Sequence, residues 1–328
     1  LLGENRTLVT YGLVVLQKTR RLGLRAMYDV AGIRPERITP ATIGFQIAPR
    51  INAAGRINHA NEALALLRSR TTDDARALAE RLQATNVERQ QLVEEAAAEA
   101  IAQVGDAGER RFLVVTGDTW LPGIVGLIAT RVRERFGRPT IALTQFDGKL
   151  LGSGRSISGF DIVDALRSCT DLLATFGGHP QACGLRLASP ADLPVFTARM
   201  EAYAAERLQP EDCVPKLAID FELRLEDVTW ELVDLLEKFE PFGVANPTPK
   251  ALARGVTVDH VMPMGSTGAH LRLLAHHTTP AQRKLVVFCF RDICPDVRPG
   301  DVVDVVFEID VNEWNGNREI QLKVVDLR

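Results

Sequence analysis

The sequence predicts a mixed α/β protein with several domains. Three observations lead to this prediction. A helical pattern of more than thirty residues runs without glycine or proline, short strand-like and helical segments alternate after it, and short strand-like runs fill the C-terminal third. A chain of 328 residues is also too long for one ordinary core. We therefore expect a helical segment (1–70), a connecting helix (71–105), an α/β domain (106–208) and a small β-barrel (209–328).

Composition places the chain among globular proteins. Hydrophobic residues make up 46% and charged residues 25% of the sequence. No run of eighteen apolar residues and no charged-then-apolar N-terminal pattern occurs, so we expect a cytoplasmic protein without a membrane span. Five cysteines lack C-x-x-C spacing, which indicates reduced structural thiols. The chain opens at Leu1 without methionine, and we expect a fragment.

The net charge of −3 is unevenly distributed. Residues 1–70 hold eleven Lys and Arg against four Asp and Glu, whereas residues 209–328 hold thirteen against twenty. This asymmetry predicts that the first segment faces a polyanion and that the last does not bind one through net charge alone. A solvated basic face is the alternative.

The segment from Thr72 to Val104 predicts one long helix. Thr72 is a plausible N-cap, and two aspartates follow it in the first turn. At 1.5 Å per residue the helix would be about 48 Å long, enough to join two lobes across a cleft. Packing along a single domain is the alternative.

Before this helix, Thr39–Gly55 predicts a short apolar stretch that runs into a small-residue turn ending just before an arginine. Two arginines six residues apart with an asparagine between them are typical of a loop that contacts phosphate. The same residues could instead form salt bridges at a helix end. The candidates in this loop are Arg50, Asn52 and Arg56.

After the long helix, we expect strands at 112–116 and 140–144, a helix at 122–136 and a hairpin turn at Asp147-Gly148 that leads into a Gly-Ser-Gly-Arg-Ser segment. An apolar-periodic segment at 160–176 predicts a helix, followed by Gly-Gly-His, so that two polar loops would meet at one helix end. Glycine N–H groups, hydroxyls, a guanidinium and an imidazole together suit a phosphate. Two ordinary glycine turns with an exposed arginine and a capped histidine are the alternative. The candidates are Ser153, Gly154, Arg155, Ser156, Gly177, Gly178 and His179.

The C-terminal part predicts an antiparallel barrel of the OB type, a common platform for single-stranded nucleic acid. Strand-like runs lie at 217–223, 251–261, 270–275, 284–290, 301–310 and 318–327, with a hairpin signal at Asn315-Gly316 and a helix at 229–239. The negative charge of this part keeps a structural or protein-docking role open. His276 and His277 would point to opposite faces of a strand with no third ligand nearby, so we expect no metal site there. No carboxylate pair or Ser/His/Asp arrangement indicates catalytic residues.

Seven motifs resemble one family in the right order. They are LLGENRTLVTYGL, IGFQIAPRINAAGRI, the long helix with NVERQ, GIVGLIATRV, LGSGRSI, FGGHPQACG and PFGVANPTP. Together they are similar to the C-terminal part of the RecJ family, single-stranded-DNA-specific 5′ to 3′ exonucleases among the DHH phosphoesterases. The resemblance implies the end of the DHH lobe at 1–70, the connecting helix, a DHH-associated domain with the Gly-Gly-His motif, and an OB fold.

The resemblance also assigns roles. Arg50, Asn52 and Arg56 would contact the DNA backbone near the scissile phosphate, and the Ser153–Ser156 segment with Gly178 and His179 would hold terminal phosphates. Two Mn²⁺ or Mg²⁺ ions would activate water in the full enzyme, with ligands expected upstream of Leu1, so we expect this fragment alone to bind and not to cut.

Single-stranded DNA is the implied partner, with a single-strand-binding protein or a helicase as further partners of a monomer that acts in DNA recombination and repair. Two alternatives stay open. One is another DHH phosphoesterase, acting on short oligonucleotides or cyclic dinucleotides, and the other is a non-catalytic single-strand-binding module.

Overall fold

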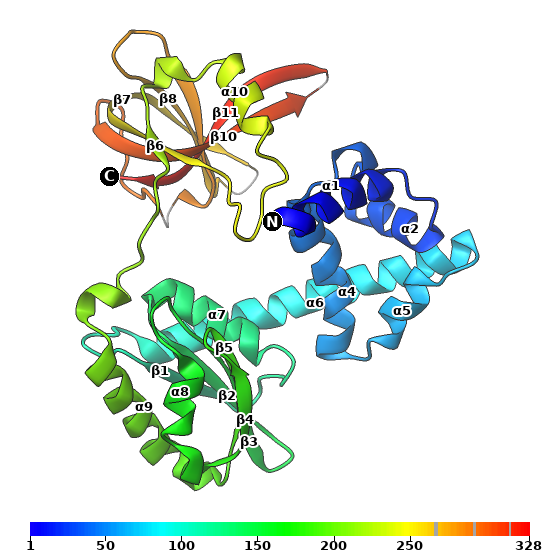
Figure 1. Ribbon diagram of the computed structural model, residues 1–328, viewed down its shortest axis with the longest axis vertical. Coiled ribbons are helices and arrows are strands. Elements are labelled where there is room, and N and C mark those ends of the chain that lie inside the picture. Colours follow the sequence, from blue (N-terminus) through cyan, green and yellow to red (C-terminus); the bar gives the residue numbers. More distant parts are fainter. Residues whose placement is uncertain (266–267, 291–292, 315) are drawn as a thin grey trace. The chain divides into compact units, whose positions relative to one another are not determined.

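The computed structural model describes residues 1–265, 268–290, 293–314 and 316–328, and the chain divides into two compact units (Figure 1). One unit is Val14–Lys216. The other joins Leu1–Leu13 to Leu217–Arg328. Among the described residues, no helix is both long and apolar enough to cross a membrane.

The first part of the unit Val14–Lys216 is helical. Its short helices pack around the N-terminal half of a long helix, α6 (Thr72–Val104), where Ala75, Ala79 and Leu82 share a buried cluster with Met27 and Leu66. The elements before α6 are α1 (Gly3–Gln17), most of which belongs to the other unit, and then α2 (Leu22–Ala31), η1 (Pro35–Arg37), α3 (Pro40–Thr42), η2 (Ile43–Ile47), α4 (Ala48–Ile57) and α5 (Asn61–Leu67).

The loop predicted at Thr39–Gly55 is wrong, because this stretch is helical. Thr39 caps α3 by accepting a hydrogen bond from the backbone N–H of Thr42, and the π-helical turn η2 leads directly into α4. Pro49 is tolerated because it lies in the first turn of α4, directly after the wide π turn. Ala53 and Ala54 are strong helix formers and are fully buried.

Helix α6 joins two parts of this unit, as its length predicts. Its N-terminal half packs on the short helices, whereas Val93, Ala96 and Ala100 in its C-terminal half share a core with the sheet domain. The N-cap is Thr71 and not Thr72, since the Thr71 side chain accepts the N–H of Asp74 at 3.2 Å.

The sheet domain has the strand order β1-β2-β3-β5-β4, with β1 and β2 parallel and the other pairs antiparallel. Helix α7 packs on one face of the sheet, while α8 and α9 pack on the other (Figure 1). Asp147 and Gly148, both with positive φ, form the predicted hairpin turn between β2 and β3. The elements are β1 (Leu113–Gly117), α7 (Val125–Phe136), β2 (Thr140–Phe146), β3 (Lys149–Arg155), α8 (Ile162–Arg167), η3 (Thr170–Leu172), β4 (Leu173–His179), β5 (Ala182–Leu187), η4 (Pro190–Asp192) and α9 (Leu193–Arg207).

The helix predicted across 160–176 is wrong in its second half. The α-helical part is limited to α8, and Leu173–His179 forms β4 at the edge of the sheet. Thr175 and Phe176 favour a strand and Gly177 disfavours a helix, so pairing with β5 prevails over an apolar spacing that only resembles helical periodicity. The helix predicted from residue 122 likewise begins later, at Val125.

The second unit contains a barrel, as predicted, but the sheet is not purely antiparallel, because β9 pairs with β11 and β6 with β7 in parallel. Its strands follow the order β10-β11-β9-β8-β7-β6, and an additional β10–β7 pairing closes it. Arg6 at the start of α1 donates to the carbonyl of Glu240 at 2.7 Å, which attaches the N-terminal residues to this unit. Asn315 of the predicted hairpin lies outside the described residues. The elements are η5 (Pro210–Cys213), which precedes this unit, and then β6 (Phe221–Glu222), η6 (Leu225–Asp227), α10 (Trp230–Glu237), β7 (Lys250–Met264), β8 (His270–His276), β9 (Arg283–Val287), β10 (Val302–Trp314) and β11 (Asn317–Leu327).

Candidate nucleic-acid interface

Five arginines from four elements of the unit Val14–Lys216 interact electrostatically in two sets that share Arg56. Burial lowers the pKa of Arg89 on α6, and the charges of Arg56 on α4 and Arg131 on α7 lower it further. Burial likewise lowers the pKa of Arg155 on β3, and Arg56 and Arg133 add to this effect. Each guanidinium therefore lies within the field of like charges. We call these five residues the arginine cluster.

Two glycines allow the close approach of these elements. A Cβ on Gly123, in the turn before α7, would lie 2.0 Å from the carbonyl oxygen of Arg56. A Cβ on Gly126, in the first turn of α7, would lie 2.7 Å from a guanidinium nitrogen of Arg155. The Arg56 guanidinium also donates to the carbonyl of Gly123 at 3.0 Å. The backbone of GIVG thus fixes where two of the arginines lie.

Arg155 is held by its own strand. Its Nη1 donates to Ser153 Oγ at 2.9 Å and to the carbonyl of Gly154 at 2.7 Å, while Ser153 Oγ donates to the carbonyl of Cys183 at 2.9 Å. Within the described parts of the chain, Arg155 Nη2 has no hydrogen-bond partner. These bonds orient the guanidinium and leave one of its nitrogens available to a ligand.

The cluster has little compensating negative charge. Among residues that the structure describes, Arg56, Arg89, Arg131 and Arg155 have no ion pair, whereas Arg133 pairs with Glu134 at 3.2 Å. In the same described set, the Nε atoms of Arg89 and Arg133 are buried without a hydrogen-bond partner. Burying a charged or donor group is costly unless a partner satisfies it. A bound anion would supply both the charge and the acceptors, and a phosphate matches the guanidinium fork.

An open face of the sheet continues from the cluster. Arg155, Ala182 and His179 are directly opposite one another on β3, β5 and β4, so their side chains share one face. Two strand spacings separate Arg155 from His179, roughly 10 Å. On the next rung Gly184 and Gly177 are exposed. The result is a flat surface of small residues between an arginine and a histidine.

The anion-binding role predicted for the glycine backbone of β3 is wrong. Strand β3 lies between β2 and β5, so its N–H groups belong to the sheet ladder. Gly154 faces the core, where an added Cβ would lie 2.6 Å from Cys183 Sγ. Ser156 is buried, and its hydroxyl donates to the carbonyl of Phe160 at 2.6 Å. Gly178 has a positive φ of 146°, and an added Cβ would clash with the Ala182 carbonyl, so it serves the strand geometry.

The three candidates on α4 are divided by the helix. Asn52 and Arg56 are four residues apart and share a face. Arg50 lies on another face, where its Nε donates to Gln83 Oε1 of α6 at 2.7 Å and burial lowers its pKa. Asn52 and Arg56 are therefore placed toward the cluster, and Arg50 fastens α4 to α6.

Sequence reasoning missed Arg89, Arg131 and Arg133. A signal for Arg89 exists, because Leu82, Asn86, Arg89 and Val93 occupy one helical face at the spacing of an apolar stripe. Asn86 is buried there and accepts a hydrogen bond from Arg89 Nη2 at 3.0 Å. Polar residues at core positions of a helix indicate a function other than packing.

A metal centre is not evident among the residues that the structure describes. No group of three or more His, Cys, Asp or Glu residues that could hold an ion occurs among the described residues. His276 Nδ1 contacts Asp259 at 2.9 Å, and His277 Nδ1 lies 3.9 Å from Glu226, each a pair within the barrel. Within the described ranges, the two Mn²⁺ or Mg²⁺ ions therefore have no fitting donor set, and no catalytic step through them follows from these residues.

Comparison with known proteins adds two domain matches. Residues 109–206 match the DHHA1 domain and residues 219–326 match the RecJ OB domain. The single-stranded-DNA-specific exonuclease RecJ of Bacillus subtilis is 35% identical over 98% of this chain. A crystal structure of RecJ from Thermus thermophilus with Mg²⁺ superposes with a TM-score of 0.85 at 32% identity over 99% of this chain, and one with Mn²⁺ gives 0.84.

These matches cover only part of each relative. The chain spans 41% of the Bacillus protein and 49% of the Thermus protein chain crystallised with Mg²⁺. The expected mixed α/β fold, with a DHH-associated domain and an OB domain, is confirmed by these matches.

Proposed function

We propose that this chain, a homologue of the RecJ exonucleases along nearly its whole length, is the strand-gripping part of an enzyme that degrades single-stranded DNA from its 5′ end. The arginine cluster is the observation that carries the proposal. Half-buried guanidinium groups without carboxylates between them suit a ligand that brings several negative charges.

The cluster would bind the phosphate backbone. Arg155, oriented by Ser153, offers its free Nη2 to one phosphate, and Arg56 and Arg89 lie within electrostatic reach of the same ligand. Such contacts position a strand and carry no sequence information. We therefore expect binding that depends weakly on base sequence and strongly on salt.

The open sheet face favours a single strand. Gly177 and Gly184 allow a sugar–phosphate backbone to approach the sheet closely, and His179 supplies a donor at its edge. The barrel belongs to the RecJ OB domain, a fold that commonly binds single strands, and we assign it the continuing part of the strand.

In the whole protein, two divalent ions held by residues other than those described would supply metal-activated water for hydrolysis. Digestion of a strand from one end is a step that recombination and repair of DNA require, and we place the whole protein there. The RecJ OB domain argues against a phosphoesterase that acts only on cyclic dinucleotides.

The purified chain is tested with end-labelled single-stranded and duplex DNA at low and at physiological salt, with Mn²⁺ or Mg²⁺ present. We expect tight salt-sensitive binding of the single strand, weaker binding of the duplex and no release of nucleotides. Equal affinity for the duplex, or no binding at low salt, would contradict the proposal. Metal-dependent release of nucleotides would show that this chain holds a complete active site.

A further inference from the structure

A cavity lies between α4 and α5, next to the arginine cluster. Its volume is about 530 Å³, a size typical of sites for small molecules. Aliphatic side chains form most of the wall, and Leu64 is 52% exposed there. Exposed apolar side chains that line a hollow indicate a surface that contacts a ligand more often than isolated ones do. The wall includes Ile51, Gly55, Ala60, Leu64 and Leu67.

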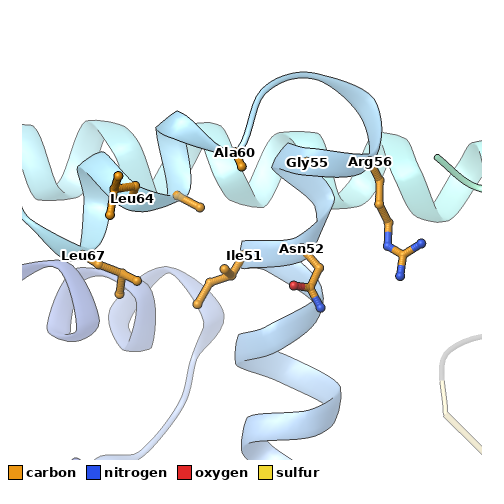
Figure 2. Close-up of a pocket in the computed structure, with 8 residues that line it drawn as sticks. Ile51, Asn52, Gly55, Arg56, Ala60, Leu64 and Leu67 are labelled. Atoms are coloured by element: carbon orange, nitrogen blue, oxygen red, sulfur yellow. The ribbon is translucent and has the colours of Figure 1, made fainter.

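The polar end of this cavity is shared with the cluster. Asn52 and Arg56 also line it, and Figure 2 shows Asn52 between Ile51 and Arg56, whose guanidinium points away from the aliphatic side chains. Arg56 is the residue whose charge acts on both Arg89 and Arg155. A ligand in the cavity could therefore place an anionic group beside Arg56.

The side chain of Asn52 is exposed and has no hydrogen-bond partner within the ranges that the structure describes. A carboxamide offers two donors and one acceptor, so it can pair with the edge of any nucleobase. A planar base has an apolar face for Ile51 and Leu64 and a polar edge for Asn52. The phosphate attached to the same nucleotide would face Arg56.

We propose that this cavity holds one unstacked nucleobase of the strand whose phosphates bind the arginine cluster. The inference rests on the proposed function and deepens it. A base in a duplex is paired and stacked and cannot enter the cavity without being extruded, which costs a few kcal/mol. The cavity would thus help this chain to prefer single strands, with little preference among bases.

The test uses oligonucleotides that each lack one base at a known position, together with Ala60→Leu, which fills the cavity from an exposed position. We expect wild type to bind one of the abasic strands about 3- to 10-fold more weakly than the intact strand. Ala60→Leu should lose the same factor on the intact strand and lose nothing further on that abasic strand. Ala77→Leu, which alters an exposed alanine of α6 that does not line the cavity, is the matched control and should bind as wild type does.

Thermal unfolding of both variants shows whether they remain folded. Two results would overturn the base site. In the first, every abasic strand binds as tightly as the intact strand. In the second, Ala60→Leu binds every abasic strand more weakly than wild type does. Arg155→Ala separates the two proposals. If that variant loses affinity while Ala60→Leu and the abasic strands do not, the phosphate site stands and the base site fails. If the wild-type chain binds no single strand, both fail.

Discussion

Cations in the two units of this chain have different surroundings. In the barrel unit several of them lie beside carboxylates: Arg254 contacts Glu222 and Asp304, and Lys284 contacts Glu319. In the arginine cluster of the other unit, the neighbours that act on Arg89 are arginines. The barrel unit holds 13 Lys and Arg against 19 Asp and Glu, and Val14–Lys216 holds 26 against 23.

This difference separates two uses of positive charge. A surface cation that is already paired with a carboxylate contributes little to stability, and its interaction with an anionic ligand is weak. A half-buried cation surrounded by like charges destabilises the free protein, and a bound anion removes this destabilisation. The comparison therefore predicts which arginines matter for DNA binding and which do not.

Removing the best-oriented arginine should have the largest effect. Arg155→Ala is expected to weaken binding of single-stranded DNA by about 1.5 to 3 kcal/mol, the worth of a charge-assisted contact, with little change in stability. Titration of a labelled oligonucleotide measures the affinity, and thermal unfolding measures the stability. Wild-type affinity would show that the Gly-Ser-Gly-Arg-Ser segment is structural.

Replacing a second arginine distinguishes a role in DNA binding from a role in folding. Arg89→Met keeps much of the apolar stem and removes the charge, so affinity should fall by about 1 to 2 kcal/mol. Removing the charge relieves its repulsion from Arg56 and Arg131 but also removes the hydrogen bond that buried Asn86 accepts, so the free energy of unfolding should change by less than about 1 kcal/mol. A clear loss of stability would mean that Arg89 supports the fold instead of a ligand.

In the barrel, by contrast, a charged carboxylate is stabilised by hydrogen-bond donors of the protein itself. Backbone and hydroxyl donors of Thr278 and Thr279 hold Glu226, and its pKa lies at about 2 although burial opposes this. A folded pKa below the unfolded one means stability that is complete above about pH 4.5 and is lost as pH falls toward 2.

Glu226→Gln should therefore cost about 1 kcal/mol at pH 7 and make the barrel less sensitive to acid between pH 4.5 and 2. Chemical denaturation across this pH range measures the difference. Parallel pH profiles for wild type and variant would refute the role of Glu226.

The smallest effect is expected at a paired surface arginine. Arg254→Ala removes contacts with Glu222 and Asp304, all well exposed, and should change stability by less than about 0.5 kcal/mol and DNA affinity by less than about twofold. A loss as large as that of Arg155→Ala would remove the distinction between paired and unpaired cations.

Sequence patterns predicted what depends on local chemistry. The long helix, the Asp147-Gly148 turn and most barrel strands follow from helix composition, turn residues and β-type runs, and the structure has them. The stretch 160–176 was only partly predicted, because its apolar residues have a spacing close to the helical period, whereas β4 exists through its antiparallel pairing with β5, the next strand along the chain.

The candidate site was predicted in part for the same reason. Arg155 and Arg56 stood out beside glycines, and the structure brings both into one cluster. Ser156 looked equally polar in sequence but is buried directly after β3, where its hydroxyl donates to the Phe160 carbonyl. Arg50 lies on a different face of α4 from Arg56 and donates to Gln83. Arg89 has a signal in the apolar stripe of α6, but that it lies near arginines of α4 and α7 follows only from the tertiary structure.

The dependence of DNA affinity on salt tests the central claim most directly. Each arginine that neutralises a phosphate of a single strand contributes roughly 0.7 to the slope of log K against log salt concentration. We predict that replacing Arg56, Arg89 and Arg155 together by glutamine or methionine lowers the slope by about 2, whereas replacing Arg254 leaves it unchanged. An unchanged slope in the triple variant, with the protein folded, would contradict the claim that the arginine cluster binds the phosphates.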